Sequence, residues 1–161
     1  MEVIRRQKVI VGGLEERFHD LTALVSETVA GLGIDLEVGE LPGEYCPGRF
    51  SLHLPGGPKV AGVAQRVIRG ASLTTAALVV EGGPALRAVI ADVYSALELS
   101  VDRSVAGALA DGRHKVEADA VLEMMRERAA ARYDAAPGEV NTEAKRWAVS
   151  RARASDPRSP S

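Results

Sequence analysis

The sequence contains few of the residues that mark extracellular or nucleic-acid-binding proteins. Its 161 residues include a single cysteine, so no disulfide can form within the chain and nothing indicates an oxidising compartment. Aromatic residues make up only 4%, which argues against a surface that stacks bases. The net charge of -2 gives no general attraction to nucleic acid or to an anionic membrane. We therefore expect neither of these as a partner.

Long apolar runs are also absent. No segment approaches the roughly 20 apolar residues of a membrane-spanning helix, and residues 1–7 lack the apolar stretch of a signal peptide. Hydrophobic residues (46%) and charged residues (26%) occur in ordinary proportions, and the length suits one domain with its own core. These properties predict a cytoplasmic protein.

The hydrophobic pattern predicts an α+β fold, with a mostly antiparallel sheet and helices packed on one face. A charged, edge-type strand is expected over residues 3–11, and Gly33 is expected to stop the first helix. Residues 41–48, rich in proline and glycine, are expected to form a loop. The predicted strands are 3–11, 36–38, 49–54, 59–69 and 72–80, and the predicted helices are 14–32, 84–97, 104–110, 117–133 and 142–154.

Two parts of this pattern concern the later helices and the end of the chain. Pro84 is expected to begin a helix with one apolar stripe. After Pro137 the hydrophobic pattern of a folded domain ends. We therefore expect a domain over residues 1–136 and a flexible or helical tail over 137–161. The apolar stripe consists of Leu86, Val89, Ile90, Val93 and Leu97.

Cys46 is the first candidate for chemistry. A lone cysteine is most often a small buried hydrophobic residue. However, Tyr45 precedes it, and Pro47 and Gly48 follow it, so the sequence places the thiol in a turn, where it is reachable. Both interpretations stand on the sequence alone.

Lys59 begins the strand that follows the next turn. It is interpreted either as an exposed lysine that discourages edge pairing or as a cation that holds a carboxylate, a phosphate or a developing oxyanion. The residues after it are unusually small for a strand, and Gly62 allows a ligand to approach the backbone. The three histidines are far apart in sequence, so no metal site is expected; they are His19, His53 and His114.

Two motifs give the chain a resemblance to a known family. They are Tyr45-Cys46-Pro47-Gly48, and Lys59-Val60-Ala61-Gly62-Val63-Ala64-Gln65-Arg66 with the following Val67-Ile68-Arg69-Gly70. On these motifs the chain resembles the biotin/lipoate protein ligase superfamily, in the branch of lipoate-protein ligases and octanoyl transferases. The resemblance extends more weakly from about Glu15 through Tyr133.

The resemblance implies roles for the motif residues. In cysteine-using members the cysteine of such a loop forms an acyl-thioester intermediate, and the lysine of the strand contacts the acyl carbonyl or the activated phosphate. Cys46 and Lys59 are therefore the catalytic candidates. The substrate-binding candidates are Tyr45, Gly48, Gly62, Ala64, Gln65 and Arg66.

The resemblance also implies that only part of the family domain is present. Members carry an Arg-Arg-x-x-Gly-Gly-type loop and several strands ahead of the region seen here, and these form the other wall of the acyl pocket. Residues 1–136 are therefore expected to be a partial catalytic domain that lacks this N-terminal half. Either a second polypeptide or self-association is expected to complete the pocket.

The activity implied by the resemblance is transfer of a lipoyl or octanoyl group onto a lysine of a lipoyl-type carrier protein. A cysteine transferase needs no cofactor, whereas a ligase needs ATP and Mg²⁺. The alternative is a non-catalytic accessory or carrier-binding module that is a truncated or diverged remnant of the family.

Overall fold

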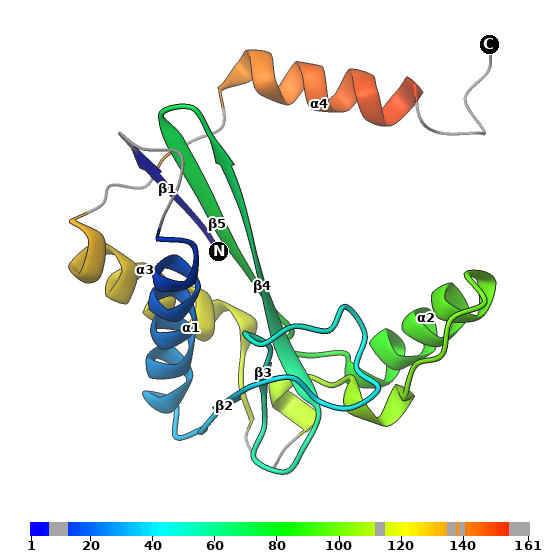
Figure 1. Cartoon of the computed structure of the whole chain (residues 1–161). Helices are drawn as coiled ribbons and strands as arrows, with labels where there is room; N and C mark the ends of the chain where they lie inside the picture. Colours follow the sequence, from blue (N-terminus) through cyan, green and yellow to red (C-terminus); the bar gives the residue numbers. More distant parts are fainter. Residues whose placement is uncertain (7–12, 112–114, 135–137, 139–140, 155–161) are drawn as a thin grey trace.

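The computed structural model describes residues 1–6, 13–111, 115–134, 138 and 141–154 (Figure 1). Five strands in this part of the chain form one sheet in the order β1-β5-β4-β3-β2, and every neighbouring pair is antiparallel. The predicted α+β class with an antiparallel sheet is therefore confirmed. The strands are β1 (Glu2–Arg6), β2 (Glu37–Val38), β3 (Leu52–His53), β4 (Lys59–Ile68) and β5 (Ala71–Leu78).

The long β4–β5 hairpin is the centre of the sheet. Its pairing runs from Ala61 opposite Leu78 to Ile68 opposite Ala71, and Gly70 takes the positive φ (+85°) that the tight turn between them requires. β1 lies at one edge of the sheet, as its charged sequence predicts. Residues 7–11 of that predicted strand lie outside the described residues.

The helices follow the predicted order. They are α1 (Leu14–Ala30), α2 (Gly83–Ala96), α3 (Ala118–Tyr133) and α4 (Thr142–Ala154). Gly31 caps α1 and Gly33 follows it with a φ of +78°, so the chain turns where a stop was predicted. The single helix expected over residues 104–110 is instead two separate 3₁₀ turns, Arg103–Val105 and Leu109–Asp111.

The core lies between one face of the sheet and the helices α1 and α3. In Figure 1 these two helices lie together on one side of the sheet, whereas α2 lies on the other side near the lower end of β4. The apolar stripe of α2 is largely exposed, because Ile90 is buried while Val89, Val93 and Leu97 are not. The core residues that share this interior are Leu21, Leu24, Val25, Val29, Leu52, Val60, Ala61, Ala76, Leu109, Val121 and Met125.

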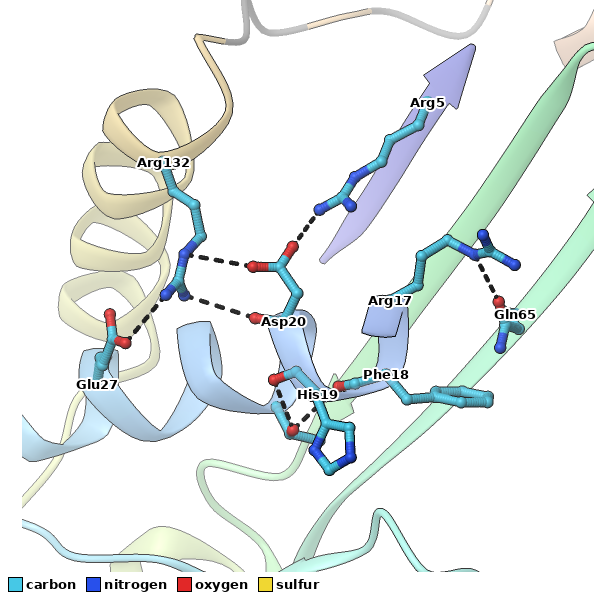
Figure 2. A network of polar contacts seen from close by, with 9 residues as sticks. Arg5, Arg17, Phe18, His19, Asp20, Glu27, Gln65 and Arg132 are labelled. Carbon is cyan, nitrogen blue, oxygen red and sulfur yellow. Dashed lines mark hydrogen bonds and ion pairs between the residues drawn. The ribbon is translucent and has the colours of Figure 1, made fainter. Parts of the chain in front are cut away.

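Asp20 of α1 connects three elements through a group of ion pairs (Figure 2). It accepts from Arg5 of β1 and lies 3.5 Å from Arg132 Nε of α3, which also pairs with Glu27 (3.0 Å). Burial raises the pKa of the Tyr133 phenol, and the neighbouring Asp20 carboxylate acts in the same direction. These partly exposed pairs fix the orientation of α3 and β1 on α1 more than they add stability.

Two features concern the chain outside this core. In Figure 1, α4 runs apart from the sheet and the other helices, and Trp147 on it is 63% exposed. The division into residues 1–136 and 137–161 stays a prediction. Among the described residues, no helix combines the length and apolarity needed to cross a membrane.

Leu52→Ala tests whether the short strand β3 is a core element. Leu52 is fully buried, so its truncation is expected to lower the free energy of unfolding by about 2 to 5 kcal/mol in urea titration. Leu97→Ala is the matched control, because Leu97 is 60% exposed and its loss is expected to cost less than about 1 kcal/mol. Equal losses in the two variants would contradict this assignment of the core.

Candidate active site

A cavity of about 690 Å³ opens beside the central hairpin, on the face of the sheet opposite the core. Side chains alternate along a strand, so Gly62 and Ala64 of β4 share this face with Thr75 and Ala77 of β5. The other walls come from the loop 45–51, from Phe18 of α1 and from Leu86 of α2. The small side chains of β4 thus form the floor of a hollow rather than lying under a packed helix.

Gly62 leaves part of this space open. A Cβ at this position would meet only the Lys59 side chain, at 3.7 Å from Cε and 4.0 Å from Nζ, and these are ordinary contacts. The packing of the chain itself therefore does not require glycine here. A larger side chain would instead occupy the cavity, which agrees with the predicted role of Gly62 in close approach of a ligand.

Lys59 lies beneath the loop that carries Cys46. It is only 2% exposed, so the alternative of an exposed edge lysine is wrong. Its ammonium donates to the carbonyl oxygens of Tyr45 and Cys46, each at 2.9 Å, and lies 3.4 Å from Glu44 Oε1. Two of the three N–H donors of the ammonium are thus used in hydrogen bonds, and the Glu44 carboxylate is a charge partner at a longer distance.

Glu44 was not among the predicted site residues, and the structure buries it completely at the side chain. Its Oε1 accepts from the Gly48 amide (2.9 Å) and the Ser51 hydroxyl (2.7 Å) and faces Lys59. The carboxylate therefore joins both ends of the loop to the buried cation. A glutamate in a glycine-rich loop gives no local sign of burial, because only the tertiary fold brings Lys59 beneath it.

Cys46 is exposed and lines the cavity, so its alternative assignment as a packed core residue is wrong. Its φ is +43°, an uncommon conformation for a residue with a side chain. Its amide N–H donates to the Tyr94 hydroxyl of α2 (2.8 Å), while its carbonyl accepts from Lys59. The thiol is thus presented to the cavity by a backbone that is held on both sides.

Tyr45 forms part of the same wall. The Lys59 ammonium lies 4.7 Å from the centre of its ring, a cation–π contact. Burial raises the pKa of the Tyr45 phenol, and the nearby Cys46, Glu44 and Tyr94 act in the same direction. Its ring is therefore a neutral, partly buried surface beside the candidate nucleophile.

The structure brings six of the eight predicted site residues together at the cavity: Tyr45, Cys46, Gly48, Lys59, Gly62 and Ala64. Gln65 instead faces α1, where it accepts from Arg17 Nε (2.9 Å; Figure 2) and donates to the Leu14 carbonyl (2.9 Å). Arg66 is exposed and does not line the cavity. For Gln65 and Arg66, substrate binding stays a prediction that the cavity does not support.

A metal centre is not evident in the part of the chain that the structure describes, where no three potential ligands gather. His53 is buried on β3 opposite Lys59, with its Nδ1 3.5 Å from Glu37, and His19 packs edge-on against Phe50. His114 lies outside the described residues.

The fold is that of the lipoate-protein ligases. The chain is similar over 92% of its length to lipoate-protein ligase A bound with ATP (TM-score 0.67, 19% identity, 58% of that chain). It is also similar to a bi-partite lipoate protein ligase from Thermoplasma acidophilum (TM-score 0.62, 18% identity, 92% and 57% of the two chains). No protein-family model matches the sequence.

Relatives found by sequence comparison carry a more specific name than the fold neighbours. The chain is 39% identical over 75 residues to an octanoyl-[GcvH]:protein N-octanoyltransferase of Geobacillus kaustophilus, a match that covers 47% of this chain and 26% of that one. It is 32% identical over 81 residues to the enzyme of the same name from Staphylococcus aureus (50% and 29%). The resemblance to the biotin/lipoate ligase superfamily is thereby confirmed. The chain spans less than a third of the length of these relatives.

Glu44→Gln tests the buried ion pair. The glutamine keeps an oxygen for Gly48 and Ser51 but leaves the Lys59 charge buried without its counter-ion, so we expect a loss of about 3 kcal/mol of unfolding free energy. Glu40→Gln, on an exposed residue four positions earlier, is expected to change stability by less than about 0.5 kcal/mol. Urea titration of both variants measures the difference, and equal stabilities would show that the pair is not a buried charge interaction.

Proposed function

We propose that this chain carries the acyl-transfer half of an active site, which moves an octanoyl or lipoyl group onto a lysine of a lipoyl-type carrier protein. The observation that carries the proposal is the exposed Cys46, fixed at the wall of a cavity of about 690 Å³ directly above a buried Lys59. This volume is within the usual range for sites that enclose a small molecule. The floor of small side chains leaves room for an extended acyl chain.

Cys46 is the proposed nucleophile. Its thiolate attacks the carbonyl carbon of an acyl thioester or amide, so that a C–S bond to Cys46 forms while the C–S or C–N bond of the donor breaks. The donor takes up a proton and leaves as a thiol or an amine. The target lysine, as a free amine, then attacks this thioester and regenerates the Cys46 thiol. The acyl group thus moves in two steps, first from the donor to Cys46 and then from Cys46 to the carrier lysine.

Lys59 has two parts in this proposal. Its contacts with the Tyr45 and Cys46 carbonyls hold the loop, and the positive charge stabilises negative charge that develops beside Cys46. Two of its N–H groups are donated to these carbonyls, and the Glu44 carboxylate lies 3.4 Å from the ammonium, so donation to the acyl oxygen competes with contacts inside the protein. We therefore expect the predicted contact between Lys59 and the substrate to form only when the substrate is bound.

The cysteine transferase is favoured over the ATP-dependent ligase. Support comes from the reachable thiol and from the sequence relatives, which are named octanoyltransferases. The ligase version, with ATP and Mg²⁺, is supported by a fold neighbour that was solved with ATP. A second polypeptide that completes the cavity agrees with the bi-partite ligase among the fold neighbours.

Cys46→Ala tests the nucleophile. The parent chain, incubated with octanoyl p-nitrophenyl ester, is expected to gain one octanoyl mass that hydroxylamine removes, since thioesters are cleaved by hydroxylamine. The variant is expected to gain none, because Cys46 is the only cysteine. Intact-mass spectrometry measures both. An equal, hydroxylamine-sensitive adduct on the variant would remove Cys46 from the mechanism.

ATP dependence separates the two versions of the reaction. With an octanoyl thioester as donor and a lipoyl-type carrier domain as acceptor, octanoylation of the carrier is expected to proceed equally with and without ATP and Mg²⁺. Mass spectrometry of the carrier measures the product. Transfer from free octanoic acid that needs ATP and persists in Cys46→Ala would instead support the ligase.

A further inference from the structure

Tyr94 connects α2 to the candidate nucleophile. Its hydroxyl oxygen accepts from the Cys46 amide at 2.8 Å, although the two residues are 48 positions apart in the chain. Tyr94 belongs to neither of the motifs that carry the family resemblance, and it does not line the cavity. The contact therefore acts on the backbone of Cys46 and not on the interior of the cavity.

The peptide group between Tyr45 and Cys46 is held at both of its ends. Its carbonyl oxygen, on Tyr45, accepts from Lys59 Nζ (2.9 Å), and its N–H, on Cys46, donates to Tyr94. Rotation of this peptide group is the simplest way for Cys46 to leave its φ of +43°. Such a rotation would break both hydrogen bonds at once.

The two holds differ in their surroundings. Lys59, which is 2% exposed, bonds to the peptide group from the buried side of the loop. The hydrogen bond to Tyr94 lies on the exposed side. A residue with a side chain occupies the left-handed region at a cost of about 1 to 3 kcal/mol, and it does so only where its surroundings impose that conformation. Lys59 alone fixes the carbonyls, and Tyr94 supplies the constraint on the amide.

We propose that Tyr94 is a positioning residue for the reaction at Cys46: its hydroxyl keeps the amide in place, and so keeps the thiol aimed at the acyl carbonyl. This inference rests on the proposed function, because it needs Cys46 as nucleophile. It adds a residue from α2 to a site otherwise built from the loop and β4. Removal of the hydroxyl should slow the chemical step without weakening binding of the acyl chain.

Tyr94→Phe tests this inference, because it removes one oxygen and keeps the ring. In the full chain labelled with ¹⁵N, hydrogen exchange of the Cys46 amide is expected to become about three- to tenfold faster, the change that one modest hydrogen bond gives. The maximal rate of acylation by octanoyl p-nitrophenyl ester, from stopped-flow release of p-nitrophenol, is expected to fall about three- to tenfold. The ester concentration at half-maximal rate should stay unchanged.

Tyr133→Phe is the matched control, since it removes a hydroxyl on α3 beside Asp20. It is expected to alter neither the Cys46 amide nor the acylation rate. A merely structural role for Tyr94 predicts lower stability and a raised half-maximal concentration, with the maximal rate unchanged.

Each other result overturns the inference in a recognisable way. Unchanged exchange of the Cys46 amide in Tyr94→Phe would show that the contact is absent in solution. Faster exchange with an unchanged maximal acylation rate would show that the contact exists but positions nothing. If the parent chain is not acylated at Cys46, the proposed function fails, and the positioning role fails with it, whatever the amide exchange shows.

Discussion

The buried ion pair between Lys59 and Glu44 is the interaction on which the site depends. A charge without solvent is costly unless oxygen atoms surround it, and the chain satisfies Lys59 with one carboxylate and two backbone carbonyls. All three oxygens come from three consecutive residues of one loop. The loop must therefore close over the start of β4, and Cys46 is brought to the cavity wall as a consequence. The conformation of Cys46 therefore follows from the neutralisation of the Lys59 charge.

Local patterns in the sequence predicted the elements well. The period of the apolar residues and the glycine and proline positions located α1, the strands β4 and β5 and the turn around Cys46, because these signals act over a few residues. β3 was predicted over residues 49–54, but it begins only at Leu52. The Ser51 amide donates to the Gly48 carbonyl in a turn, so only the Ser51 carbonyl, which accepts from the Gly39 amide (2.9 Å), bonds across to the neighbouring segment. A competing local hydrogen bond shortened the strand.

The contacts that complete the site were beyond local patterns. Tyr94 bonds directly to the Cys46 amide, although the two residues are 48 positions apart. Glu44 pairs with Lys59, which it reaches only because β4 folds beneath the loop. The sequence showed the apolar stripe of α2 but not that the stripe is largely exposed. Periodicity shows which residues share a face of a helix, but not which other element covers that face. Family resemblance pointed to Cys46 and Lys59, whose catalytic roles stay a proposal. The residues that arrange them required the fold.

The two faces of β4 have a further consequence for how this chain can change. Ala61 and Gln65 point toward the core and α1, whereas Gly62 and Ala64 between them form the floor of the cavity. Adjacent positions of this strand thus have different surroundings, the core and α1 on one face and the cavity on the other. A substitution at Gly62 or Ala64 can therefore change the shape of the cavity without altering the packing of β4 on the core and α1, whereas a substitution at Ala61 or Gln65 alters that packing.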